Sequence, residues 1–127
     1  MFLNVSNHPS ENWSVEQREA ALRLVAENGG IERIEDYPFP QVKASMTEAQ
    51  IEVLSEQIVG DIISRKPTVV MCQGEYTLTY QLVKWLQKKG IKVVAACSER
   101  QTVETILEDG STKREAVFTF VQFREYR

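Results

Sequence analysis

The chain has one histidine and two cysteines among its 127 residues, and these three side chains are not grouped in the sequence. A zinc site of the usual kind needs several His and Cys ligands at short spacings, so we expect no structural metal, and no other cofactor is indicated. Cys72 and Cys97 each end an apolar segment, where a thiol usually behaves as a small buried hydrophobic group. We therefore expect no disulfide.

Long apolar runs are also missing, and the longest extends only from Val93 to Cys97. A membrane-spanning helix needs about 20 consecutive apolar residues, so we expect no membrane span. The first residues, Met1 to Val5, lack the basic start and the long apolar core of a secretory signal and are typical of a first strand. These absences predict a cytoplasmic protein.

Neither sign of charge is in large excess, because 15 basic residues face 18 acidic ones and the formal net charge is −3. Proteins that bind long duplex nucleic acid depend on many phosphate contacts from Lys and Arg, so this class of function is not expected. A small anion held by a local positive pocket remains compatible with this balance.

Two segments have the spacing of a capping box, in which Ser or Thr precedes Gln by three residues at a helix start. Ser14 with Gln17 and Thr47 with Gln50 have this spacing, and apolar residues follow both pairs at helical intervals. The expected helices run from about Val15 to Asn28, from the Thr47 cap to Lys66, and from about Leu78 to Lys89.

Apolar segments that alternate with these helices are expected to be strands. They are Phe2 to Val5, Ile31 to Tyr37, Thr68 to Cys72 and Ile91 to Cys97. Pro38 and Pro40 predict that the second is an edge strand or an irregular extended piece, and the almost continuous apolar content of the fourth indicates the centre of the sheet. Asp109-Gly110 separates two further β-rich runs, Thr102 to Leu107 and Ala116 to Phe123, and predicts a hairpin.

The length and the order of elements predict one domain over residues 1–127. We expect an α/β fold with three Rossmann-like layers, in which a mainly parallel sheet carries a C-terminal antiparallel hairpin.

Three expected strands end in polar residues. These are Ser6, Asn7 and His8 after the first, Gln73, Gly74, Glu75, Tyr76 and Thr77 after the third, and Ser98, Glu99 and Arg100 after the fourth. The carboxyl ends of parallel strands form the ligand crevice of open α/β sheets. The three endings therefore predict one site, at which His8, Gly74 and Arg100 lie along a single rim.

Each ending also has a purely structural interpretation. The Gly74 turn can hold a phosphate at a helix start or can simply cap the helix, and Glu75 adds a negative charge there. His8 can be a proton donor or can close a turn before Pro9. Arg100 can bind phosphate or pair with Glu99 or Glu104. Trp13 can pack beside the first helix or, less readily, stack on a base.

Two segments resemble the small CRISPR-associated Rossmann-fold (CARF-like) proteins, which include stand-alone ring nucleases. They are the opening strand and turn, Phe2 to Pro9, and the turn Gly74 to Thr77 leading into a helix with Gln81 to Val83. Glu75 departs from the small or donor residues that the pockets of this family favour. The resemblance covers most of the chain in element order and about fifteen residues in motif.

This resemblance implies a homodimer that binds a cyclic oligoadenylate in facing crevices and cleaves it without metal, as a phosphodiesterase that regulates type III CRISPR defence. A ribose 2′-hydroxyl would attack the adjacent phosphate while protein donors stabilise the developing charge. The residues that match the pocket are His8 and Ser6, as candidates for the chemistry, and Asn7, Gln73, Gly74, Thr77 and Arg100, as candidates for ligand binding.

Two other functions are compatible with the same crevice. One is a non-catalytic module that binds a nucleotide or serves in assembly. The other is a different small Rossmann-like enzyme for a nucleoside or nucleotide, with Glu75 or Glu99 as nucleophile or base.

Overall fold

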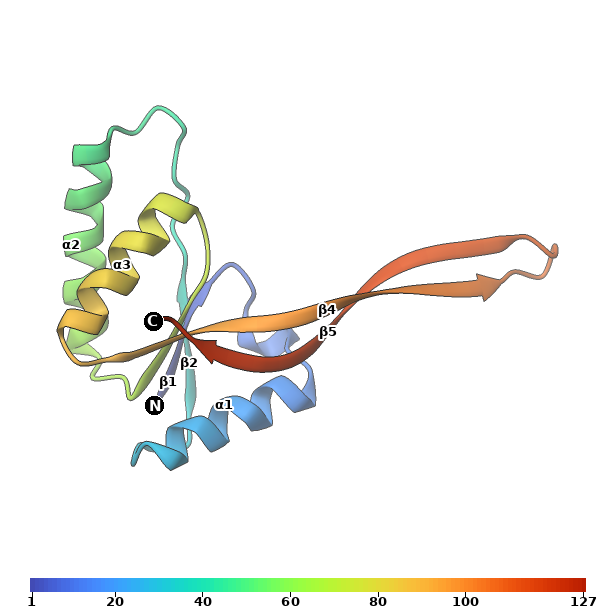
Figure 1. Ribbon diagram of the computed structural model, residues 1–127, viewed down its shortest axis with the longest axis horizontal. Coiled ribbons are helices and arrows are strands. Elements are labelled where there is room, and N and C mark those ends of the chain that lie inside the picture. The colour runs from blue at the N-terminus through green and yellow to red at the C-terminus, as the bar shows by residue number, and fades with distance from the viewer.

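Strands and helices alternate along the first three quarters of the chain, and the last two strands form a long hairpin (Figure 1). The computed structural model describes all residues, 1–127. The elements are β1 (Phe2–Ser6), α1 (Val15–Glu27), β2 (Ile34–Pro38), α2 (Glu48–Ser64), β3 (Val69–Cys72), α3 (Tyr76–Lys88), β4 (Lys92–Ile106) and β5 (Thr112–Glu125), with a 3-10 turn, η1 (Ser10–Asn12), after β1. The predicted α/β class is confirmed.

The five strands form one sheet in the order β2-β1-β3-β4-β5. The first four are parallel, and β5 runs antiparallel to β4. The prolines correctly predicted that β2 lies at an edge. The prediction that the Ile91 segment occupies the centre was wrong, since β3 is the middle strand and β4 lies between β3 and β5.

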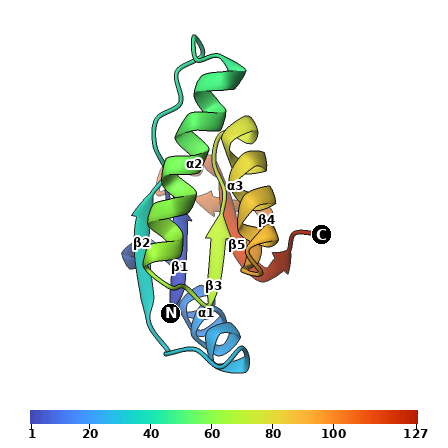
Figure 2. The same cartoon turned by 90° about the vertical axis from the view of Figure 1, so that its left-hand side faces the viewer.

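Helices cover both faces of the sheet, with α1 on one side and α2 and α3 on the other (Figure 2). Because side chains alternate along a strand, neighbours in β1 join different layers. Phe2 packs with Ala21 and Val25 of α1, whereas Leu3 packs with Ile58 of α2 and the other residues on the second face. None of these helices combines the length and apolar character needed to cross a membrane.

Both predicted N-caps are present, but they differ in completeness. Thr47 Oγ1 accepts a hydrogen bond from the backbone N–H of Gln50, whose side chain accepts one from the Thr47 N–H, so the capping box is complete. At the other helix start Ser14 Oγ accepts the bond from the Gln17 N–H, but the Gln17 side chain does not return one to the Ser14 N–H. The shared spacing therefore predicted both helix starts correctly, but the reciprocal bond of the capping box forms only at Thr47.

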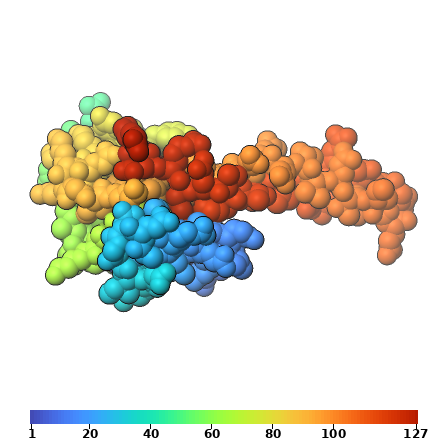
Figure 3. All heavy atoms as spheres, turned by 60° about the horizontal axis from the view of Figure 1, so that its bottom comes forward, coloured from blue at the N-terminus to red at the C-terminus, as the bar shows by residue number.

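The expected end of a strand at Cys97 is wrong, because β4 continues to Ile106 and pairs with β5 along its length. A register shift between Cys97 and Ser98 marks the point where the paired strands leave the body. We call residues 98–120 the arm and the rest of the chain the body. Every residue from 98 to 119 is exposed, and the arm projects far beyond the helices (Figures 1 and 3).

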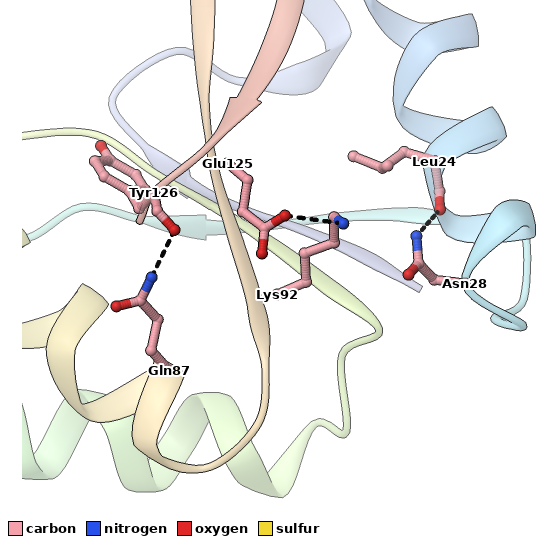
Figure 4. Close-up of polar contacts among 6 residues, drawn as sticks. All are labelled: Leu24, Asn28, Gln87, Lys92, Glu125 and Tyr126. Atoms are coloured by element: carbon pink, nitrogen blue, oxygen red, sulfur yellow. Dashed lines mark hydrogen bonds and ion pairs between the residues drawn. The ribbon is translucent and has the colours of Figure 1, made fainter.

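The C-terminal end of β5 is anchored to the body (Figure 4). Tyr126 donates its backbone N–H to Val93 O at 3.0 Å and accepts a bond from Gln87 Nε2 at 2.7 Å. Its hydroxyl donates to Cys72 O at 2.7 Å, and burial raises the pKa of this phenol. The ion pair between Lys92 and Glu125, at 3.1 Å, joins the two strands at the same place. The arm therefore projects from a well-held base.

Candidate functional site

A buried asparagine organises the loop that follows β1. Asn4 is 1% exposed, and its Nδ2 donates to His8 O and to Asp36 Oδ1, both at 2.8 Å. Its Oδ1 accepts a bond from Ser6 Oγ at 2.6 Å. A buried amide is stable only when such partners are present, so these bonds hold the backbone at His8 in place.

Ser6 belongs to the same network and is buried. Its hydroxyl donates to Asn4 and accepts the His8 N–H at 3.1 Å, and the residue is 5% exposed. A hydroxyl that is buried and bonded in this way is not placed to act as a nucleophile or proton donor for a ligand. In the structure the Ser6 hydroxyl helps to hold the loop after β1.

Asp36, in the middle of β2, completes the network that holds the loop after β1. Its carboxylate accepts bonds from the backbone N–H of Ser10 at 3.1 Å and from the Ser10 hydroxyl at 3.0 Å. Arg18 Nη1 donates to Ser10 O at 2.6 Å, which ties the loop to α1. The sequence prediction missed Asp36 and Asn4, although a polar residue inside the apolar run Phe2 to Val5 was a signal for the latter.

A cleft of about 980 Å³ lies on the α1 side of the sheet, where the body meets the arm. Its lining comes from the loop after β1, the first turn of α1, the carboxyl end of β3, Ala96 of β4 and the base of the arm. These residues are Asn7, His8, Pro9, Asn12, Trp13, Ser14, Glu16, Gln17, Met71, Gln73, Ala96, Ser98, Phe118, Thr119 and Phe120. The chain leaves β1 toward α1 and β3 toward α3 on the opposite face, so the cleft adjoins the point where the strand order reverses.

The cleft is lined mainly by neutral polar groups and aromatic rings. Glu16 is its one acidic residue, His8 is its one imidazole, and no Lys or Arg lines it. Side-chain amides and hydroxyls supply both donors and acceptors. The lining therefore suits a planar, polar ligand better than a bare phosphate.

Aromatic side chains connect the cleft wall to the core. Trp13 lies edge-on to Phe2, with ring centroids 6.0 Å apart, and donates from its indole nitrogen to His8 O at 3.1 Å. Phe123 contacts Phe2 at 5.1 Å and Phe120 at 4.9 Å. Trp13 thus packs against the core as expected while it also lines the cleft, and edge-on and tilted rings join the arm base to the segment just before α1.

The N-terminus of α3 is occupied by the protein itself. The Glu75 carboxylate accepts bonds from the backbone N–H groups of Thr77 at 3.1 Å and Leu78 at 2.9 Å, and from the Thr77 hydroxyl. The bonds from Leu78 and Thr77 lower the pKa of Glu75. The structure therefore favours the capping interpretation of this turn, because the donors expected to hold a phosphate already bind a carboxylate.

The other residues of this turn also have structural partners. An added Cβ at Gly74 would lie 2.5 Å from the ring of Phe39, so the glycine allows close packing against that ring. Gln73 lines the cleft, but its side chain accepts from Ala96 N at 2.7 Å and donates to Ala96 O at 3.3 Å. The Gln73 side chain therefore continues the hydrogen bonding between β3 and β4 beyond the last residue of β3.

Arg100 lies in the arm, opposite Phe118 and exposed. It is on the same face of β4 as Ser98 but farther from the body, and it does not line the cleft. The predicted single rim is therefore incomplete. Asn7, His8 and Gln73 line one cleft, Ser6 lies beneath it, and Gly74, Thr77 and Arg100 lie outside it. No three His, Cys, Asp or Glu side chains are grouped so that they could hold a metal ion.

The family profile of the "Uncharacterized protein MJ1673 family" matches residues 1–124, and the chain belongs to this family. The matched range includes the body strands, the cleft and the whole arm, so all of these elements fall within the family's shared region. The comparison with curated proteins finds no match.

Proposed function

We propose that this member of the MJ1673 family binds a cyclic oligoadenylate in the cleft between the β1 loop, α1 and the arm. The observation that carries the proposal is the lining of the cleft, in which aromatic rings and neutral amides lie together at the carboxyl ends of β1 and β3. The resemblance to CARF-like proteins names the ligand. We place this activity in the cytoplasm and in a homodimer, with no role for long nucleic acid.

The chemistry of adenine supports this choice of ligand. An adenine ring stacks on aromatic faces and forms hydrogen bonds with neutral donors and acceptors along its edges. Phe118 and Phe120 offer rings, and Asn7, Asn12 and Gln17 offer amides. A volume of about 980 Å³ is at the upper end of the ~300–1,000 Å³ typical of small-molecule sites, so there is room for more than one nucleotide.

Metal-independent cleavage of the ring is the second part of the proposal. The ribose 2′-hydroxyl would attack the adjacent phosphate and lose its proton to solvent water, and the P–O5′ bond would break to leave a 2′,3′-cyclic phosphate. His8 would donate a proton to the leaving 5′-oxygen or stabilise the charge on the phosphate. His8 is exposed and lines the cleft, while its backbone is held by Asn4 and Ser6. Most of the rate would come from the positioning of the ligand.

The proposal is tested by incubating the protein with cyclic tetra-adenylate and cyclic hexa-adenylate in EDTA, with calorimetry for binding and chromatography for products. Ser98→Trp should fill the cleft and abolish binding, and His8→Ala should reduce cleavage by about 100-fold while the ring still binds. Glu75→Ala, which changes a residue outside the cleft, is the control that should retain both activities. Absence of binding to either ring would refute the proposed function.

The second candidate function is binding of the ring without cleavage, which is favoured by the small number of titratable side chains in the cleft. His8 and Glu16 are the only titratable side chains that line the cleft, and the buried Ser6 is not placed for chemistry. An intact ring recovered from a stable complex, with equal affinity in the wild type and His8→Ala, would identify a binding module.

A further inference from the structure

The arm exposes a large apolar surface that nothing in the chain covers. Ile106 is 79% exposed, Phe118 is 69% exposed, and Val103 and Val117 are more than one-third exposed. A two-stranded ribbon is at best marginally stable in water without a third strand or a packed face. An arm of this length therefore needs a partner surface.

The free edge of β5 indicates where that partner binds. β5 contains 14 residues, is the last strand of the sheet and pairs only with β4. It has no proline, and Val117, Phe118, Thr119, Phe120 and Val121 form a run of β-branched and aromatic residues. Proline would block pairing at a strand edge, so a long edge without it is a template for pairing with another strand.

We propose that the β5 edges of two copies of this chain pair antiparallel about a two-fold axis near Val117, so that the two sheets become continuous. Each arm then becomes part of a four-stranded ribbon, which exceeds the minimum needed for independent stability. A two-fold axis makes the contact self-complementary and closed, which prevents further growth into a filament.

The charge pattern of β5 favours a second copy of the chain as the occupant. Lys113, Arg114 and Glu115 lie toward the tip, whereas residues 116–123 toward the body carry no charge. Antiparallel pairing places the charged half of one strand opposite the uncharged half of the other, so like charges do not face each other. Within one copy Arg114 Nε pairs with Glu104 at 2.9 Å, and both side chains are exposed, so this pair contributes little stability and leaves the rest of the guanidinium free. With the axis at Val117, Arg114 lies opposite Phe120 of the second copy, which allows a cation–π contact.

This arrangement would also complete the cleft, an extension that rests on the proposed function. No Lys or Arg of the same chain lines the cleft, although the proposed ligand carries phosphates. Phe120 is part of the lining, so the partner's Arg114 would reach the same rim. A guanidinium matches the geometry of phosphate oxygens, and each ligand site would then contain residues from both copies.

The interface is tested by sedimentation equilibrium without nucleotide. The wild type should be a dimer, and Val117→Lys or Val117→Glu should each raise the dissociation constant by roughly 100-fold, because like charges would meet at the axis. An equimolar mixture of the two variants should form dimers again. Val53→Lys is the matched control, because Val53 is 56% exposed on α2 and Val117 is 40% exposed on the arm.

A monomeric wild type, Val117 variants that remain dimers, or two monomeric variants that do not recombine would each overturn the interface. For the cleft, Arg114→Gln should leave the dimer intact and weaken ring binding by about tenfold. Unchanged binding by Arg114→Gln would overturn the shared site alone. Failure of the wild type to bind either ring would remove the proposed function and the shared site together, while the dimer measured without nucleotide would stand.

Discussion

Two strands, β4 and β5, run through both the body and the arm, in opposite surroundings. In the body, Val93 and Val94 of β4 are 0% and 1% exposed, because α3 and α1 cover the two faces of the sheet. In the arm, β4 and β5 keep their pairing but both faces are uncovered. The pairing of β4 with β5 therefore depends on the local sequence pattern and the turn that joins them, whereas the burial of their side chains depends on where the helices end.

A phenylalanine in each region provides the sharpest test of this contrast. Phe2 is 0% exposed and contacts Trp13 and Phe123, whereas Phe118 is 69% exposed in the arm. Phe2→Ala should lower the free energy of unfolding by about 3–5 kcal/mol, because it leaves a cavity in the core. Phe118→Ala should change it by no more than about 0.5 kcal/mol when the protein is dilute enough to be monomeric.

Urea denaturation of the two variants at the same low protein concentration measures this difference. Equal losses of stability would show that the arm is packed within a single copy, which would remove the contrast between the regions.

The polar network of the body predicts the next largest effect. Asn4→Leu should cost about 2–3 kcal/mol, because the His8 carbonyl, the Ser6 hydroxyl and Asp36 each lose a partner. Ser55→Ala is a suitable comparison, since Ser55 is 0% exposed but forms only one bond, to Glu52 O in its own helix.

Thermal unfolding monitored by circular dichroism would rank these two variants. If Asn4→Leu proved no more harmful than Ser55→Ala, the loop after β1 would be held by packing and not by the buried amide.

Two exposed carboxylates that accept backbone hydrogen bonds, one in the body and one in the arm, predict a smaller effect on stability that depends on pH. Hydrogen bonds lower the pKa of Glu75 in the body and of Asp109 at the arm tip. A lowered folded-state pKa means that the stabilisation is present above the unfolded pKa and is lost as the pH falls through the folded value. The contribution of Glu75 should therefore be complete at neutral pH and decline below about 4.5, its ordinary value.

Glu75→Gln should cost about 0.5–1 kcal/mol at pH 7, a modest loss because the group is exposed to solvent, and the difference from wild type should shrink toward pH 3. Asp109→Asn should leave the unfolding midpoint unchanged at both values, since the arm tip does not contribute to the body's cooperative core. Urea titrations at pH 7 and pH 3 separate these outcomes, and a constant difference for Glu75→Gln would argue against the charged cap.

Most of the fold was predictable because its signals are local. Apolar period, N-cap residues and glycine stops predicted the three helices, and the prolines predicted the edge position of β2. The long strand β4 was wrongly divided into Ile91 to Cys97 and Thr102 to Leu107, since the polar run Ser98 to Arg100 resembles a strand end. Polar residues are equally compatible with a strand that continues without a covering layer, and the sequence pattern does not distinguish these cases.

The candidate site was predicted only in part. Asn7, His8 and Gln73 do line one cleft, because they follow adjacent parallel strands. The lining from α1 and from the arm base, including Phe118 and Phe120, was missed, since it depends on how distant segments pack. Glu75 was recognised as a conflict with phosphate binding, and its bonds to the helix start explain that conflict.

The sequence by itself determined the alternation of helices and strands and the turn at Asp109-Gly110, because backbone preference and side-chain period act over a few residues. Three features could be seen only in the folded structure. The strands β4 and β5 extend beyond the helices, Glu75 caps the start of α3, and the cleft lies beside the arm. These outcomes depend on contacts between residues far apart in the chain, and local pattern carries no information about which of them meet.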